Sequence, residues 1–239
     1  MTLQRTYQRE LHICGNTRCL KTPLALLPFY KLSEYEIVLM DSGVERDSSV
    51  ADYFEANGMR VAAIFTTHGH FDHVGGHSSL RERFGSTVYL PQEEYLHTVD
   101  DPAINKPPLA FAASDQLCGC TPDILIPIGC THVTVKGRRF DIIHCPGHTA
   151  GHVAYVTPDR VCYLGDLLAS ANYLSAAKLL FEENLAEDRR SKEQICNRSF
   201  AFCVAHRGVI PGEQLPELVQ KNLNPQESTS TLPVYRCQR

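Results

Sequence analysis

Residues 66–76 read TTHGHFDHVGG and place three histidines and one aspartate within six consecutive residues. Imidazole and carboxylate groups are ligands that zinc, iron and manganese take in proteins. The one-residue spacing of His68 and His70 lets both rings converge from an extended turn, and Asp72 and His73 continue around the same turn. We therefore expect this segment to form part of a metal site.

The elements expected on both sides of this segment place it at the end of a strand. Residues 35–43 form an apolar run that suits a buried strand, and a helix capped by a serine is expected over 48–58. A second strand over 59–67 leads into the histidines, and a helix over 73–85 follows them. The histidines thus emerge at the C-terminal end of a strand, where α/β sheets place their sites.

The rest of the chain predicts a strand-rich half and a helical end. In order, we expect a strand at 87–91, a long loop at 100–123, short strands over 131–168, a helix over 175–200, a strand at 201–205, a helix at 216–224 and a tail over 225–239. The long loop is a candidate wall of a substrate pocket, with Lys106, Phe111 and nearby Tyr95 as contacts. A simple surface excursion is the alternative interpretation.

The composition is that of one folded domain. The chain has 239 residues, of which 43% are hydrophobic and 21% charged, and its apolar runs stay short of the ~18 residues that a membrane span needs. A net charge of −4 without a basic stripe disfavours a nucleic-acid partner. We expect a cytoplasmic protein that acts on a small molecule, with no membrane partner. The number of subunits stays open, a homodimer included.

The ten cysteines favour reduced thiols, because a chain of this length needs no disulfide framework. Cys118 and Cys120 are too closely spaced for a zinc knuckle, and Cys14 with Cys19 has no second pair. We interpret both pairs as structural or incidental.

Two later motifs also place a possible ligand at the end of an expected strand. CPGHTAGH spans 145–152, where the Pro-Gly pair lets His148 turn back toward a site that lies off the strand axis. YLGD spans 163–166, and the two carboxylate oxygens of Asp166 allow it to span two cations.

Three motifs, THGHFDHVGG, CPGHTAGH and YLGD, resemble the signatures of the metallo-β-lactamase-fold hydrolases and occur in the same order. The likeness covers almost the whole chain. The resemblance implies an α+β fold, a four-layer αββα sandwich, in a single domain over 1–239. It also implies two metals, each held by three side chains and joined by a bridging aspartate. The corresponding residues are His68, His70 and His148 for the first metal, Asp72, His73 and one further histidine for the second, and Asp166 for the bridge.

The last ligand of the second metal has two candidates. Many relatives carry it directly after a Pro-Gly pair, where this chain has Glu213 in VIPGEQ. His206 directly follows the apolar strand AFCVA and is similar to members in which a histidine precedes the terminal helix. We favour His206. If neither residue served, a single-metal site would be the better description.

The likeness is nearest to the glyoxalase II and lactonase-like branch. It implies that a metal-bound hydroxide attacks a small thioester, ester or lactone, with two zinc ions and Asp72 as catalytic residue. Iron and manganese are the other candidate metals. One alternative is a persulfide dioxygenase with a single iron held by His68, His148 and Asp166, and another is a phosphoesterase of the same fold. Class B β-lactamases are disfavoured, because they generally lack the bridging aspartate.

His77, His144 and His152 flank these motifs and could orient the ligands through hydrogen bonds. Asp41 ends an expected strand that the resemblance places near the metals, so it could have the same role. Simple packing is the alternative for the histidines, and a turn-forming role is the alternative for Asp41.

Overall fold

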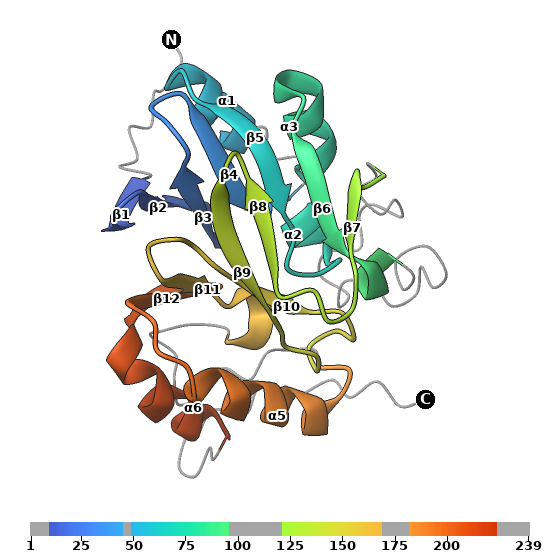
Figure 1. Cartoon of the computed structure of the whole chain (residues 1–239), viewed down its shortest axis with the longest axis vertical. Helices are drawn as coiled ribbons and strands as arrows, with labels where there is room; N and C mark the ends of the chain where they lie inside the picture. Colours follow the sequence, from blue (N-terminus) through green and yellow to red (C-terminus); the bar gives the residue numbers. More distant parts are fainter. Residues whose placement is uncertain (1–9, 45–48, 96–120, 169–181, 224–239) are drawn as a thin grey trace.

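The computed structural model describes residues 10–44, 49–95, 121–168 and 182–223, and it arranges them in four layers (Figure 1). Two β-sheets face each other in the centre, and helices cover the outer face of each sheet. The predicted α+β fold, an αββα sandwich, is therefore confirmed.

The first sheet has seven strands within the described ranges, ordered as they occur in the chain. They are β1 (Glu10–Cys14), β2 (Thr17–Lys21), β3 (Leu26–Lys31), β4 (Glu36–Met40), β5 (Arg60–Phe65), β6 (Thr87–Pro91) and β7 (Ile124–Ile126). Neighbours from β1 to β4 pair antiparallel, and neighbours from β4 to β7 pair parallel. Strands β4 and β5 are almost wholly apolar, because both faces of this part of the sheet are covered.

The second sheet has six strands in the order β13-β12-β11-β10-β9-β8 among the described residues. They are β8 (His132–Val135), β9 (Arg138–His144), β10 (Val153–Val156), β11 (Val161–Tyr163), β12 (Phe202–Ala205) and β13 (Gly208–Pro211). The β11–β12 pair is parallel, and the other neighbours pair antiparallel. The expected strand-rich half corresponds to β8 through β11.

The helices divide between the two outer layers and the connections. They are α1 (Ser49–Ala56), α2 (Phe71–Val74), α3 (His77–Phe84), α5 (Leu185–Cys196), α6 (Leu215–Leu223) and the short 3-10 turns η1 (Gly165–Leu167) and η2 (Gly212–Gln214). Residues 92–95 add a further helical turn after β6. Helices α1 and α3 pack on the first sheet, and α5 and α6 pack on the second.

The core between the sheets is built around Phe65, the last residue of β5. Its ring stacks on that of Tyr155, with centroids 5.1 Å apart, and meets Phe140 edge-on at the same separation. Buried aromatic rings supply much of the apolar area that holds two sheets together. Strand β5 therefore leads directly from the centre of the core to the histidine-rich turn.

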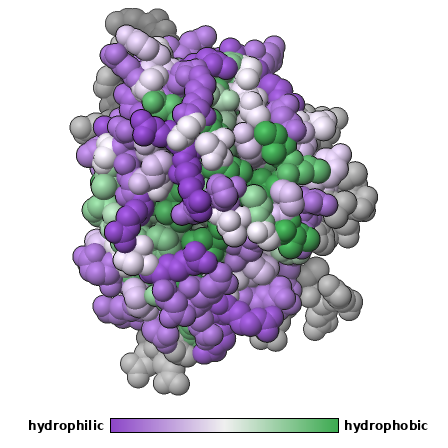
Figure 2. Space-filling model, in the orientation of Figure 1, coloured by the Kyte–Doolittle hydropathy of each residue, from purple (hydrophilic) through white to green (hydrophobic). Residues whose placement is uncertain are grey.

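The outer surface is mainly hydrophilic in this view (Figure 2). Hydrophobic residues gather near the position of β6 and β7, where Ile124 and Leu125 are among the exposed apolar side chains. The lower part, where α5 and α6 lie, is mostly hydrophilic. None of the described helices combines the length and the apolar character required to cross a membrane.

The cysteines with described positions are free thiols, in line with the expected reduced state. Cys14 and Cys19 take part in neither group of metal-ligating side chains found among the described residues. Cys118 and Cys120 lie outside those residues.

The sequence prediction missed several strands and was wrong at two helices. Strands β1 to β3, which form one edge of the first sheet, were not expected, and neither were β7 and β13. The single helix expected over 73–85 is divided between α2 and α3. A helix was expected over 175–200, and the structure describes residues 182–200 of this range. Only Leu185–Cys196 are helical there, and residues 182–184 precede the helix. Most of the expected 100–123 loop, including Lys106 and Phe111, and the expected tail over 225–239 lie outside the described residues.

Candidate metal centre

The histidines and aspartates singled out from the sequence meet at one edge of the two sheets. Each comes from a segment that directly follows the C-terminal end of a strand, so the fold collects side chains that are far apart in sequence. His68 and His70 follow β5, Asp72 and His73 lie in α2, His148 lies between β9 and β10, Asp166 lies in η1 after β11, and His206 follows β12. The structure brings all seven together in two groups.

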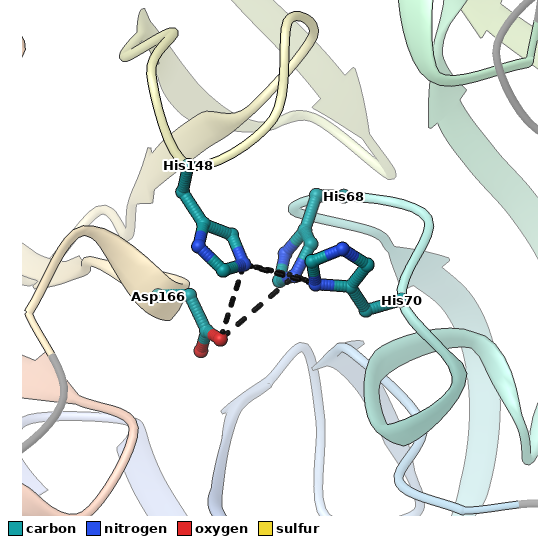
Figure 3. Close-up of side chains that lie close together, drawn as sticks. All are labelled: His68, His70, His148 and Asp166. Carbon is teal, nitrogen blue, oxygen red and sulfur yellow. Dashed lines mark hydrogen bonds and ion pairs between the residues drawn. The ribbon is translucent and has the colours of Figure 1, made fainter. Parts of the chain in front are cut away.

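The first group consists of His68, His70, His148 and Asp166 (Figure 3). His70 Nδ1 lies 2.9 Å from both His68 Nε2 and His148 Nε2, which are themselves 3.2 Å apart. Asp166 Oδ2 lies 3.3 Å from His148 Nε2 and 4.0 Å from His68 Nε2. Three ring nitrogens and one carboxylate oxygen therefore point at a common centre.

The second group consists of Asp72, His73 and His206. Asp72 Oδ2 lies 3.3 Å from His206 Nε2 and 3.8 Å from His73 Nε2. The other oxygen of Asp166, Oδ1, faces this group at 3.2 Å from His73 Nε2 and 3.9 Å from His206 Nε2. The carboxylate of Asp166 thus lies between the two groups, with one oxygen toward each. Glu213 lies in η2 and is in neither group.

The nitrogen and oxygen atoms of the two groups suit coordination of divalent ions better than hydrogen bonding to one another. His73 Nε2, His206 Nε2 and Asp166 Oδ1 are buried and have no hydrogen-bond partner within the described part of the chain, although His73 Nε2 and Asp166 Oδ1 lie at ion-pair distance. In the first group three ring nitrogens lie close to one another, and each can either donate or accept a hydrogen bond but not both. The three pairs therefore cannot all be hydrogen-bonded at once. Zinc–nitrogen bonds of about 2.0–2.1 Å in a tetrahedron place ligand atoms about 3.3 Å apart, close to the separations in the first group.

The two groups differ in the protons that they hold without metal. Burial and neighbouring imidazoles lower the pKa of His70 to about 3 and hold that of His68 well below its usual value. Burial also lowers the pKa of His73, but three carboxylates, foremost that of Asp166, outweigh it and raise this pKa well above its usual value. His68 and His70 therefore offer neutral nitrogens, whereas His73 carries a proton that a bound ion would have to displace.

This difference predicts that filling the second group releases protons. At pH 7 we expect about one proton per chain from His73 when an ion binds the second group, and almost none from His68 and His70 when an ion binds the first group. Affinity for that second ion should rise up to about tenfold per pH unit below the raised pKa of His73 and level off above it. Calorimetric zinc titrations in two buffers of different ionisation enthalpy measure the released protons. Equal heats in both buffers at the second step would contradict this assignment.

Asp41 orients His73 and the turn before it. This buried residue directly follows β4 and has a φ of 57°, and its Oδ1 accepts a hydrogen bond from Thr67 N at 2.7 Å. Its Oδ2 accepts from Thr67 Oγ1 at 2.8 Å and lies 2.7 Å from His73 Nδ1. A proton on Nδ1 directed at this carboxylate leaves Nε2 facing the second group.

The flanking histidines have different partners. His152 Nε2 accepts a hydrogen bond from the backbone N–H of Asp166 at 3.2 Å, so this ring contacts the segment that carries Asp166. His77 Nε2 lies 3.0 Å from Thr66 Oγ1, beneath the histidine-rich turn. His144 Nε2 instead lies 3.2 Å from the carbonyl oxygen of Cys130.

Helix α5 supports the loop that carries His148. The backbone N–H of Asn184 donates to Gly147 O at 2.9 Å, and Ser191 Oγ donates to Pro146 O at 2.7 Å. Gly147 has a φ of 135°, and a Cβ placed there would overlap the backbone of Asp188. Helix and loop are therefore in direct backbone contact behind the first group.

Sequence reasoning missed two polar residues that hold this edge together, Thr67 and Glu94. Thr67 links Asp41 to the histidine-rich turn. Glu94 is buried and accepts hydrogen bonds from two ligand-bearing loops. Its local sequence, PQEEY, is polar and shows no sign of burial, so only the tertiary fold identifies it.

Comparison with curated proteins finds hydroxyacylglutathione hydrolases among the relatives. The protein from Shewanella baltica strain OS155 is 31% identical over 163 residues, which are 67% of this chain and 51% of that protein. The one from Chromohalobacter salexigens is 28% identical over 137 residues, covering 56% of this chain and 44% of the relative. The chain thus spans about half the length of these relatives.

Comparison with solved structures shows the same fold. The B3 metallo-β-lactamase BLEG-1 aligns with a TM-score of 0.69 at 22% identity, covering 82% of this chain and 93% of that structure. A metallo-β-lactamase superfamily protein from Sulfolobus tokodaii aligns with a TM-score of 0.63 at 18% identity, covering 89% and 86%.

A family profile also matches the region that supplies most of the clustered side chains. Residues 33–195 match the profile described as the metallo-beta-lactamase superfamily. This span includes both sheets' central strands and every residue of the two groups except His206. Because the match covers well over half of the chain, this protein belongs to the metallo-β-lactamase superfamily.

Proposed function

We propose that this chain is a metallohydrolase that holds two divalent ions, zinc most readily, and hydrolyses a small thioester. The observation that carries the proposal is the position of Asp166, with Oδ2 at 3.3 Å from His148 Nε2 and Oδ1 at 3.2 Å from His73 Nε2. A carboxylate between two ligand groups suits sites that hold ions about 3.5–4 Å apart. Histidine and carboxylate donors favour zinc, with iron and manganese as the other candidates.

The chain's own residues would share the work of hydrolysis. The two ions, once held by these residues, would make water a better nucleophile at neutral pH and would polarise the carbonyl oxygen of a substrate. Burial raises the pKa of Asp72, but His73 and His206 outweigh this effect and lower it, so the carboxylate is ionised at neutral pH. We assign Asp72 the catalytic role of orienting the attacking water while it binds the second ion. Asp166 fixes the spacing of the two groups.

The thioester preference rests on the names of the relatives. Hydroxyacylglutathione carries its acyl group on the sulfur of glutathione, so its hydrolysis is attack of water on a thioester carbonyl. Esters and lactones present the same kind of acyl carbon and are the next candidates. Because the chain spans about half of those relatives, their complete substrate is not carried over to it.

The proposal is tested by metal analysis joined to a substrate panel. Purified protein should contain about two zinc ions per chain and should cleave thioesters faster than lactones, esters or phosphodiesters. The variant His68→Ala should lose the ion of the first group and turnover, since His68 is fully buried at its centre. The matched control is His132→Ala, which changes an exposed histidine on β8.

The same experiment separates the alternatives. One iron per chain together with oxygen uptake on glutathione persulfide would replace the proposal with a persulfide dioxygenase. Cleavage of phosphodiesters alone would replace it with a phosphoesterase. The presence of a complete second group, Asp72, His73 and His206, supports a two-ion hydrolase over a one-iron site.

A further inference from the structure

Glu94 connects two loops that carry ligands of the first group but belongs to neither. It lies in the helical turn at residues 92–95, after β6, and its side chain is buried with 2% of the residue exposed. Oε2 accepts a hydrogen bond from Gly69 N at 2.7 Å. Oε1 accepts from Thr149 Oγ1 at 2.6 Å and from Gly151 N at 2.8 Å. Both oxygens are therefore used, and every donor lies in a ligand-bearing loop.

The positions of these donors link Glu94 to three metal-ligating rings. Gly69 lies between His68 and His70, and Thr149 directly follows His148. The two loops bring His70 Nδ1 within 2.9 Å of His148 Nε2, although neither loop's own backbone sets that distance alone. A buried side chain that accepts hydrogen bonds from both loops constrains their separation.

The local packing leaves little room for Glu94 to move. A Cβ built on Gly151 would lie 2.7 Å from Glu94 Oε1 and 2.8 Å from its backbone nitrogen. The carboxylate is thus enclosed by the loop backbone with which it bonds. A buried carboxylate without hydrogen-bond donors would destabilise the fold. The donors to Glu94 therefore have to keep their positions.

We propose that Glu94 is a positioning residue that holds the turn of His68 and His70 and the loop of His148 at the spacing that the first metal ion requires. The inference rests on the proposed two-ion site and adds a residue that ligates neither ion. It predicts a selective effect, because the second group is oriented through Asp41 and His73 instead. Loss of Glu94 should weaken the ion at the first group and spare the one at the second.

The sharpest substitution is Glu94→Gln, which keeps the size of the side chain. An amide has one acceptor oxygen, so its NH2 group must face at least one of the N–H donors that now bond to the carboxylate. We expect about a 10- to 100-fold weaker affinity for the ion at the first group, the usual effect of removing a residue that orients ligands. Glu93→Gln is the matched control, since it makes the same change at the neighbouring position.

The experiment titrates metal-free full-length protein with Co²⁺ and records the visible absorption spectrum, with a chelator to set the free ion concentration. Wild type and Glu93→Gln should bind two ions in two steps. Glu94→Gln should shift only the step assigned to the first group and change its ligand-field bands. The milder Thr149→Val removes one donor and should shift the same step by less, which keeps the test valid if Glu94→Gln does not fold.

The outcomes separate this inference from the proposed function. If wild type binds two Co²⁺ ions and both variants keep its affinities and spectrum, Glu94 has no positioning role, while the two-ion proposal stands. Equal weakening of both steps would assign Glu94 a general structural role and overturn the inference. Failure of wild type to bind Co²⁺ would overturn the two-ion proposal and this inference together.

Discussion

Replacing Asp166 with asparagine is expected to leave the purified protein with one ion or fewer and to lower hydrolysis about 10³-fold or more. The reason is the placement of the two carboxylate oxygens, one toward His148 and one toward His73. An amide offers only one oxygen, and its NH2 group cannot ligate a cation. The substitution also removes the negative charge that offsets the repulsion between two divalent ions. Metal analysis and steady-state thioester hydrolysis measure the two effects.

The control for Asp166→Asn is Asp141→Asn, which removes the same charge from an exposed position on β9. This control should retain both ions and full turnover. If Asp166→Asn also kept two ions and its activity, Asp166 would not bridge the two groups. Retention of two ions with lost turnover would instead place the role of Asp166 in the reaction and not in metal binding.

The central strands were predictable because their sequence pattern and their burial agree. Strands β4 and β5 lie within the expected ranges 35–43 and 59–67, and the expected Gly85, with a left-handed φ of 64°, caps helix α3 directly after its last residue, Phe84. Short apolar runs bounded by turn residues are typical of such buried parallel strands. The histidine-rich turn was identified from its own residues, whereas the roles of His148, Asp166 and His206 came from the resemblance to the family.

The N-terminal strands escaped prediction because their sequence conflicts with the usual signals. Strand β3 contains Pro28, and a proline normally argues against a strand inside a sheet. The pairing of β3 with β4 explains why a proline is tolerated at position 28, since the register of these two strands begins at Phe29. The missing N–H of Pro28 thus falls just outside that ladder.

The start of α5 had a local signal that the prediction did not use. The Asn184 side chain accepts hydrogen bonds from Ala186 N and Glu187 N, which makes Asn184 the N-cap of the helix. Asparagine is among the residues most favoured at this position, and an acidic residue in the first turn adds to the signal. In contrast, the role of Glu94 arises from contacts 25 and 57 residues away, which no local pattern encodes.

Replacing Gly147 with alanine is expected to destabilise the protein by about 3 kcal/mol or more and to weaken the ion at the first group. Gly147 combines a φ of 135° with backbone contact to α5, so a methyl group must both strain the loop and displace Asp188. The loop cannot yield without moving His148, because the Glu183 N–H donates to His148 O at 3.3 Å. Chemical denaturation of the metal-free protein and Co²⁺ titration measure the two effects.

Gly137→Ala separates backbone strain from displacement of the helix. Gly137 also has a positive φ, 75°, but a Cβ placed there meets nothing within 4 Å. This control should therefore lose only about 1 kcal/mol, the strain of a left-handed alanine, and should bind Co²⁺ as wild type does. If Gly147→Ala were no more destabilising than Gly137→Ala, the contact between α5 and the His148 loop would be too soft to position this ligand. The spacing of the first group would then depend on Glu94 and the loop itself, and not on the helix behind it.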